Sequence, residues 1–301
     1  MSLRTSRAHA PAEVVIDRAR CNSCGLCTKV CNMTLVMVAG ELTVDQSRLW
    51  GCIGCGQCVA VCPEDAIRVE GRDFRTTDAF PIPSREDRTG YNDLLNLFHA
   101  RRSIRRFRPP EISPALIERI INAASTAPMG VPPSDVSLLV FRSREKVREF
   151  AADLRESMRR MRWMFSGPGL LLLRPMLGKE GCESFKEFVG PLVDTYLEKH
   201  AGGTDMLFYD APLAIYFYGS PYADPADPII AATYAMLAAE ALGVGSCMIG
   251  LPGPCIKNDR KLREEYGIPK NCQPGIVIVF GYADVKFKRA VHRRFAQVRY
   301  M

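Results

Sequence analysis

Apolar residues follow two different patterns along the chain. Before residue 72 they form short runs, at Val14 to Ile16, Leu35 to Val38 and Leu42 to Val44, which predict short β-strands packed over a small core. After residue 90 they recur every three or four positions, first between Leu94 and Phe98, which predicts amphipathic helices. The change of pattern predicts two domains of different architecture.

The second half alternates helical and strand-like stretches. Ser113 is the expected N-cap of a helix that carries apolar residues from Leu116 to Ala124. The longer elements follow as a list: amphipathic helices at about 144–164, 182–200 and 229–242, and strands at 136–141, 214–219 and 276–280. Helices around a modest sheet predict an α+β domain. We expect an N-terminal domain at 1–72, a linker rich in charge and turn residues at 73–90, and an α+β domain at 91–301.

Composition narrows the classes of protein. With 301 residues, 47% apolar and 24% charged, the chain is not disordered or fibrous. The net charge of +7 suits phosphate-bearing cofactors or acidic partners, and we expect no nucleic-acid partner. No apolar run is long enough for a membrane span and residues 1–13 lack an apolar signal core, so we expect a cytoplasmic protein without a membrane partner. In a reducing compartment the twelve cysteines are metal ligands or buried thiols.

Eight of the twelve cysteines lie in an internal repeat with a 31-residue period. The first copy has Cys21, Cys24, Cys27 and Cys31, and the second has Cys52, Cys55, Cys58 and Cys62. Gly25 recurs as Gly56. A pair of zinc sites is the alternative to iron-sulfur chemistry, but a tetrahedral zinc site has no use for the third closely spaced cysteine of each run.

The doubled C-x2-C-x2-C-x3-C spacing, with Pro63 after its last cysteine, resembles the bacterial two-cluster ferredoxins, in which the fourth cysteine of each run serves the other cluster. The resemblance implies one 4Fe-4S cluster on Cys21, Cys24, Cys27 and Cys62, and another on Cys52, Cys55, Cys58 and Cys31. Asn32 stands where proline follows the first run, which removes no ligand.

A cluster of basic residues opens the second domain, Arg101-Arg102-Ser103-Ile104-Arg105-Arg106-Phe107. Guanidinium groups and a hydroxyl suit a phosphate. Without further context, a solvated helix end is the alternative interpretation.

Several motifs in order resemble the nitroreductase family, whose members bind FMN at a dimer interface. They are the arginine cluster, Ala127-Pro128-Met129-Gly130, Asp210-Ala211-Pro212, the segment from Glu240 to Ser246 with Met248-Ile249-Gly250, then Gly281-Tyr282 and Arg293-Arg294. The resemblance implies a homodimer. It also implies FMN contacts from Arg101, Arg102, Ser103, Arg105, Pro128, Met129, Gly130, Met248, Ile249, Gly250, Arg293 and Arg294. A backbone N–H of Gly250 or Ile249 is expected at flavin N5, where a donor stabilises the reduced flavin.

Other features add less. Val131 to Val136 stands where many family members have an Asn and a Gln-Pro-Trp, which predicts a reshaped wall beside the flavin. The segment from Met158 to Met164 is either a basic lid or an amphipathic helix with core-facing Met and Trp. The remaining cysteines are expected to be buried and inert: Cys182, Cys247, Cys255 and Cys272. No Rossmann glycine pattern is present.

The expected function is that of an FMN-dependent oxidoreductase. Electrons from an external donor, a ferredoxin or NAD(P)H, pass between the clusters and FMN, which reduces a small-molecule acceptor such as a nitroaromatic or quinone. Two alternatives stay open. NAD(P)H reduces the flavin and the clusters carry electrons outward to a partner, or the chain is a non-catalytic electron-transfer or flavin-handling protein. A cluster-based sensor would need a DNA-binding element that the sequence does not offer.

Overall fold

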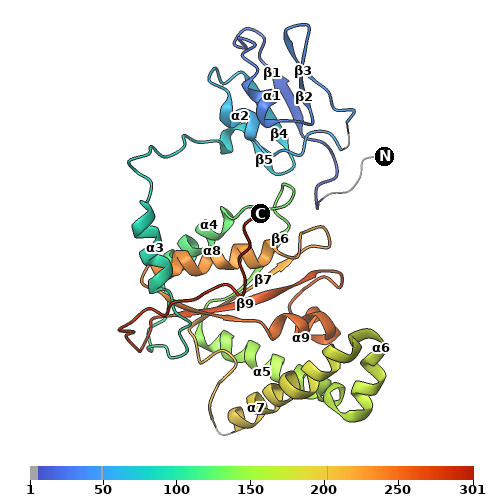
Figure 1. The fold of residues 1–301 in the computed structure, drawn as a ribbon, viewed down its shortest axis with the longest axis vertical. Helices are drawn as coiled ribbons and strands as arrows, with labels where there is room; N and C mark the ends of the chain where they lie inside the picture. The colour runs from blue at the N-terminus through green and yellow to red at the C-terminus, as the bar shows by residue number, and fades with distance from the viewer. Residues whose placement is uncertain (1–5, 49, 202) are drawn as a thin grey trace. The chain divides into compact units, whose positions relative to one another are not determined.

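The computed structural model describes residues 6–48, 50–201 and 203–301. Its contacts divide the chain into two compact units (Figure 1). The first unit comprises residues 1–88 together with two segments from later in the chain, 128–137 and 219–227. The second unit comprises 89–127, 138–218 and 228–301.

The first unit contains two small antiparallel sheets. One has the order β1-β4-β5, with β1 at Glu13–Ile16, β4 at Ile67–Gly71 and β5 at Phe74–Arg75. The other pairs β2 (Leu35–Val38) with β3 (Glu41–Val44). These bounds confirm the three strands predicted before residue 72, and β5 extends the sheet into the segment expected to be a linker.

Two short helices occupy equivalent places in the repeat. They are α1 (Leu26–Val30) and α2 (Gln57–Val61), and they pack on each other. Gly25 and Gly56 precede them with φ of 71° and 70°, a left-handed conformation that glycine adopts without steric cost. A short 3-10 helix, η1 (Thr76–Asp78), follows β5.

The second unit is built on a four-stranded sheet with the order β6-β7-β9-β8. Its strands are β6 (Val136–Phe141), β7 (Leu213–Gly219), β8 (Gly245–Ile249) and β9 (Gln273–Gly281). Three of them confirm predicted strands. The sequence did not predict β8, which pairs antiparallel with β9 from Gly245 opposite Gly281 to Ile249 opposite Val277.

Helices cover both faces of this sheet. In Figure 1, α4 and α8 lie along one face, and α5 and α9 along the other. The helices outside the α6–α7 region are α3 (Tyr91–Ala100), α4 (Pro114–Ser125), α5 (Arg144–Met161), α8 (Asp227–Ala241), α9 (Pro252–Asn258) and α10 (Arg260–Glu265). Ser113 caps α4 as predicted, since its Oγ accepts the Leu116 N–H at 3.4 Å. The α+β prediction for this part of the chain is confirmed.

The region after α5 differs from the prediction. A single helix was expected at about 182–200, but the chain forms η2 (Arg162–Phe165), α6 (Gly167–Ser184), a π-helical turn η3 (Phe185–Val189) and α7 (Gly190–Ala201). Gly178 interrupts α6 with φ of 68°. Met158 is buried as the amphipathic interpretation required, but Trp163 is 53% exposed, so its expected place in the core is wrong.

Within the described residues, no helix has the length and apolar character needed to cross a membrane.

Candidate functional site

The first thiol site comprises Cys21, Cys24, Cys27 and Cys62. All four line one cavity, together with Gly25 and apolar residues of the small core. Burial raises the pKa of Cys27, and its neighbours Cys24 and Cys62 raise it further. The fourth cysteine of the second run therefore lies with the first three of the first run, as the exchanged ligand set requires.

The second thiol site comprises Cys31, Cys52, Cys55 and Cys58. Burial raises the pKa of Cys58 to about 12, and the thiols of Cys52, Cys31 and Cys55 add to that shift because they lie close by. Cys31 from the first run thus joins three cysteines of the second. The two sites are formed reciprocally.

The backbone explains this exchange. Cys31 and Cys62 are the C-caps of α1 and α2, so each side chain leaves its own run after one helical turn. Backbone N–H groups point at three of the sulfurs: Thr34 N–H to Cys31 Sγ at 3.5 Å, Gly54 N–H to Cys52 Sγ at 3.5 Å, and Ala66 N–H to Cys62 Sγ at 3.3 Å. Such donors stabilise negative charge on thiolates and tune a cluster's potential.

The chemistry of these sites fits iron-sulfur clusters. Each set consists of thiols alone, the soft ligands that such clusters take. In the described part of the chain, no three His, Cys, Asp or Glu side chains are grouped closely enough to hold a single metal ion. The eight cysteines are all free of disulfides.

The arginine-rich segment of the second unit runs beside the end of the sheet. Ile104 N–H donates to Ser246 O at 2.9 Å, and Ser103 forms a parallel bridge with Ser246. Farther on, Phe107 forms a bridge with Ala283, and Arg108 N–H donates to Tyr282 O at 2.8 Å. The segment therefore starts at a helix end, with Arg101 as the C-cap of α3, and contacts with β8 and with the residues after β9 hold the part that follows.

The charges of this segment are only partly compensated. None of Arg101, Arg102 and Arg105 forms a salt bridge within the described residues, although the first two lie near Glu240, where they oppose the rise that burial causes in its pKa. Arg105 stacks over the Tyr209 ring at 6.0 Å. Burial also raises the pKa of Cys247. Arg105, Ser103 and Arg101 lie near its thiol and lower that pKa in part. Cationic groups of one segment therefore gather at the β8 end of the sheet.

Two observations on β8 fit a bound cofactor. The Ser246 side chain is fully buried and its Oγ has no hydrogen-bond partner among the described residues, an unsatisfied state that costs about 1–3 kcal/mol. Gly250, which follows β8, is exposed, and a Cβ built there would meet no atom within 4 Å. Met248 is half-buried and Ile249 is buried. An orphaned hydroxyl, partly compensated arginines and open space beside Gly250 suit a phosphate-bearing planar cofactor.

The other predicted contacts lie elsewhere. Arg293 and Arg294 are exposed in a C-terminal segment without regular structure, and within the described residues no hydrogen bond or ion pair joins them to the arginine cluster. Pro128, Met129 and Gly130 belong to the first unit, where Gly130 N–H donates to Asp227 Oδ2 at 3.4 Å.

Sequence reasoning missed two buried charged residues of the first unit. Arg72, assigned to the linker edge, is 8% exposed, and Asp135, assigned to the altered wall, is 6% exposed. They lie 63 positions apart in sequence, and no periodic signal joins them. The sequence gives a signal only for Asp135, which is the one charged residue in the stretch from Val131 to Val136.

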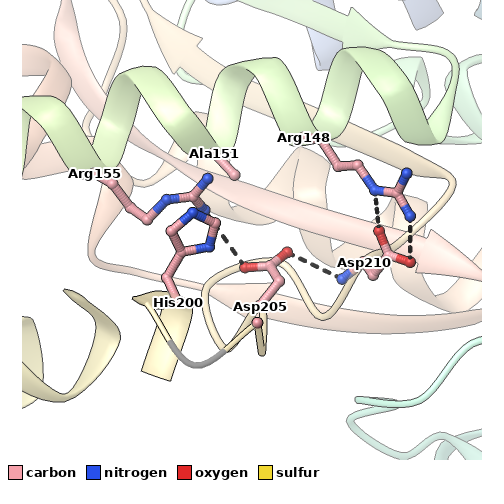
Figure 2. A pocket seen from close by; sticks show the side chains of 7 residues that line it. Arg148, Ala151, Arg155, His200, Asp205 and Asp210 are labelled. Carbon is pink, nitrogen blue, oxygen red and sulfur yellow. Dashed lines mark hydrogen bonds and ion pairs between the residues drawn. The ribbon is translucent and has the colours of Figure 1, made fainter. Parts of the chain in front are cut away.

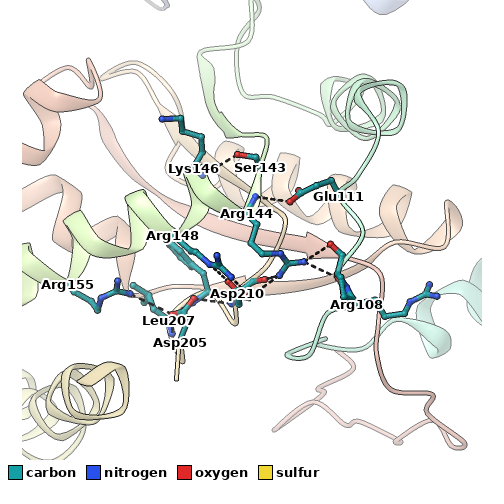
Figure 3. A network of polar contacts seen from close by, with 12 residues as sticks. Arg108, Glu111, Ser143, Arg144, Lys146, Arg148, Arg155, Asp205, Leu207 and Asp210 are labelled. Carbon is teal, nitrogen blue, oxygen red and sulfur yellow. Dashed lines mark hydrogen bonds and ion pairs between the residues drawn. The ribbon is translucent and has the colours of Figure 1, made fainter. Parts of the chain in front are cut away.

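The second unit has a further polar cavity, shown in Figure 2. Its walls include Arg148, Arg155, His200, Asp205 and Asp210. Asp210 accepts from Arg148 at 2.6 and 3.0 Å, and Asp205 accepts backbone N–H groups of Leu207, Phe208 and Asp210 (Figure 3). The carboxylates are therefore occupied by structural contacts.

The thiols outside the repeat are structural in part. Cys247, Cys255 and Cys272 are buried as predicted. Cys182 is only partly buried, so the prediction was wrong there, and its Sγ lies 3.6 Å from Leu170 O.

Comparison with known proteins gives the family. The profile of the Nitroreductase family matches residues 99–282, and that of the 4Fe-4S dicluster domain matches residues 13–63. A nitroreductase with bound FMN from Bacteroides fragilis, solved by crystallography, covers 71% of this chain and 100% of its own at 19% identity, with a TM-score of 0.50. At this identity the likeness shows the fold. NADH-quinone oxidoreductase subunit I of Pelobacter propionicus is 33% identical over an alignment of 92 residues, and the match covers 26% of this chain and 46% of that protein.

The chain spans about half the length of that curated relative. Together the two profiles cover both halves of the chain, in the order that the motifs predicted. The chain belongs to the nitroreductase family, a family of oxidoreductases, and carries a 4Fe-4S dicluster domain at its N-terminal end.

Proposed function

We propose that this protein is an FMN-dependent oxidoreductase in which two 4Fe-4S clusters exchange electrons with the flavin, which reduces a nitroaromatic, a quinone or a similar conjugated acceptor. The observation that carries the proposal is the reciprocal pair of four-thiol sites in a chain whose other unit has a nitroreductase fold. We place the clusters in residues 1–72, followed by a linker at 73–90 and the flavin domain at 91–301.

When bound, FMN converts between one-electron and two-electron chemistry, while the clusters carry one electron each. The chain's own residues bind and orient it. Arg101, Ser103 and Arg105 supply guanidinium and hydroxyl donors for the phosphate, aided by Arg102 and by Arg293 or Arg294. Ser246 Oγ gains a partner that the protein does not provide.

The end of β8 supplies the contact to the reacting part of the ring. We expect the backbone N–H of Gly250 or Ile249 there: Ile249 is the last residue of β8, and a Cβ built at Gly250 would meet no atom within 4 Å. A donor at flavin N5 favours the reduced state. Met248, on β8 itself, forms a wall of the site.

The thiol sites determine how electrons enter. The clusters that they would hold could accept electrons singly from a low-potential external donor, such as a reduced ferredoxin. The protein acts in the cytoplasm, where thiolate ligands persist.

A homodimer belongs to this proposal. Large apolar side chains stay exposed in the C-terminal segment, with Phe295 at 86% and Tyr300 at 95% exposure, as expected of a surface that a second copy covers. Arg293 and Arg294 lie in this segment and would reach a flavin of the partner subunit. Analytical ultracentrifugation at micromolar concentration should give twice the chain mass, and a monomer would exclude a shared site.

The test of function is anaerobic reduction of the purified, cofactor-loaded protein. NADH, NADPH and a reduced ferredoxin are added in turn, and flavin and cluster absorbance are followed separately. Reduction of both chromophores by the ferredoxin, then oxidation by 4-nitrobenzoate, supports the proposal. If only a nicotinamide reduces the flavin, the direction of electron flow is reversed, and a protein that purifies without FMN and does not bind it is not this enzyme.

A matched pair of variants tests the phosphate contact. Arg105 and Arg106 are adjacent and exposed, but extended backbone turns their side chains to opposite sides. Arg105→Gln should weaken FMN binding about 10- to 100-fold, the value of a charge-assisted hydrogen bond of roughly 1.5–3 kcal/mol. Arg106→Gln should leave the affinity unchanged. Equal losses in both variants would mean that only net charge matters.

A further inference from the structure

The first unit contains a cavity that only one of the two thiol sites adjoins. On one side its walls are Ile53, Cys55 and Phe74, next to the ligands of the second thiol site, and on the other they are Met129, Pro132 and Ser134. All these residues belong to the same compact unit. Cys55 is the exposed cysteine of its site.

Arg72 joins the two sides. Its guanidinium is buried and donates to Ile53 O at 3.1 Å, next to Cys52, and to Pro132 O at 2.8 Å. It also donates to Ala8 O at 3.3 Å and to Ser6 Oγ at 3.0 Å. A planar fork with five N–H donors can hold several acceptors in fixed directions, which a lysine ammonium cannot do. Arg72 therefore fixes the ligand turn of the second site and the Pro132 segment in one arrangement.

A second contact holds the far end of the same segment. The buried Asp135 carboxylate accepts the Arg7 backbone N–H at 3.2 Å, and Arg7 Nε donates to Ser134 O at 3.3 Å. The Asp135 carbonyl accepts Ser220 N–H at 2.8 Å. A buried carboxylate persists only when it is satisfied in this way. The segment from Pro132 to Asp135 is thus held at both ends.

Among the residues that the structure describes, the first thiol site has no such neighbour. The cavity that its four cysteines line is otherwise formed by residues 22–67 alone. The residue one repeat before Arg72 is Glu41, which is exposed on β3. The internal symmetry of the dicluster domain is therefore broken at the second site.

We propose that the cluster of the second thiol site is the one that exchanges electrons with the flavin, and that Arg72 is the positioning residue for this transfer. The inference rests on the proposed function, because it takes Pro128 to Gly130 as the turn beside the flavin. The first thiol site is then the entry point, and electrons pass from it through the second site.

The experiment starts from the full chain loaded with FMN and iron, reduced with dithionite and freed of excess reductant under anaerobic conditions. The reduced chain holds four electrons, two on the flavin and one on each cluster. Each 4-nitrobenzoate takes two electrons from the protein and two protons from solvent, which gives the nitroso compound and water. Stopped-flow mixing should show a fast phase, in which the flavin's own pair is used, and a slower phase, in which the two clusters deliver the second pair.

Arg72→Gln should leave the fast phase unchanged and slow the cluster phase at least about tenfold, because transfer between two redox centres depends on how precisely they are positioned. Arg72→Lys keeps the positive charge but not the planar guanidinium. The rate of its cluster phase should lie between those of the parent protein and Arg72→Gln. The matched control is Arg20→Gln, because Arg20 precedes Cys21 of the first site and forms an exposed ion pair with Asp65 at 3.6 Å. It should alter neither phase.

Iron and sulfide content, cluster potential and FMN content of each variant show whether the sites remain intact. If Arg72→Gln lowers the cluster content, Arg72→Lys with full content carries the test. A cluster phase unchanged in an intact Arg72 variant, or slowed only by Arg20→Gln, overturns the inference. Absence of the fast phase in the parent protein contradicts the proposed function instead.

Discussion

The repeat offers a controlled test of what holds the cluster domain together. Gly25 and Gly56 precede equivalent helices with nearly equal φ, 71° and 70°. Replacing either by alanine places a Cβ in the left-handed region, at a cost of about 1–2 kcal/mol. The surroundings differ, since a Cβ at Gly56 would lie 2.6 Å from Phe74 Cζ, whereas the nearest atom at Gly25 is Thr28 Oγ1 at 3.9 Å.

Gly56→Ala should therefore lower the free energy of unfolding more than Gly25→Ala does. The difference is the cost of overpacking against Phe74, roughly 1–3 kcal/mol. Phe74 packs against the core of the dicluster domain, so moving its ring disturbs that core. For a domain of this size each kcal/mol lowers the melting temperature by about 4–8 °C. For each kcal/mol that the steric overlap with Phe74 costs, the melting temperature of the Gly56 variant should lie about 4–8 °C below that of the Gly25 variant.

The assay is the thermal bleaching of cluster absorbance, measured anaerobically at one heating rate because cluster loss is irreversible. Phe74→Leu combined with Gly56→Ala should recover most of the difference, since the shorter side chain clears the new methyl group. Equal melting temperatures for the two alanine variants would refute the reasoning. So would a double variant that is no better than Gly56→Ala.

Three further predictions concern the second unit. Ser246→Ala removes the orphaned buried hydroxyl, so the FMN-free protein should become more stable by up to about 1–3 kcal/mol while FMN binding weakens, as measured by melting and by flavin titration. Asp205→Ala should destabilise by about 3–5 kcal/mol in denaturant unfolding because it leaves buried Arg155 without its ion pair, and Asp210→Ala, at a more exposed pair, should cost less. Burial raises the pKa of Asp259, but the hydrogen bonds and charge of Arg160 and the Leu262 N–H lower it by more. The pKa therefore lies below its ordinary value of 3.8. Its stabilisation is thus complete above pH 3.8 and is lost as pH falls through the folded pKa, so Asp259→Asn should flatten the acid limb of the stability profile.

Regular, local patterns let the sequence predict much of this fold. The cysteine repeat and the strands Leu35–Val38 and Val136–Phe141 were predicted because the spacing of ligands and the alternation of β-branched residues are local signals. The strand Gly245–Ile249 was missed because it contains Gly, Ser, Cys and Met and depends on pairing with β9. The helix Gly167–Ser184 was missed because Pro168, Pro175 and Gly178 oppose a helix locally.

The candidate sites show the same division. Cysteines and arginines reveal themselves by type and spacing, whereas Ser246 becomes notable only when its burial and missing partner are known. Arg72 stands immediately before the predicted linker, and its importance comes from acceptors on Ser6, Ile53 and Pro132, which no single window of sequence contains. Local patterns in a single sequence do not reveal contacts between segments that lie far apart in the chain.

The exchange of Cys31 and Cys62 has a consequence for how the two clusters depend on each other. Each site takes three thiols from one run and one from the other, so neither half of the repeat completes a site alone. Because so small a core gains much of its stability from bound metal, loss of one cluster frees a cysteine-bearing helix end that the other site also needs to hold in place. Assembly should therefore be cooperative, with chains that carry either both clusters or neither. Arg72 links the second site to a further segment as well, since its guanidinium donates both to Ile53 O and to Pro132 O.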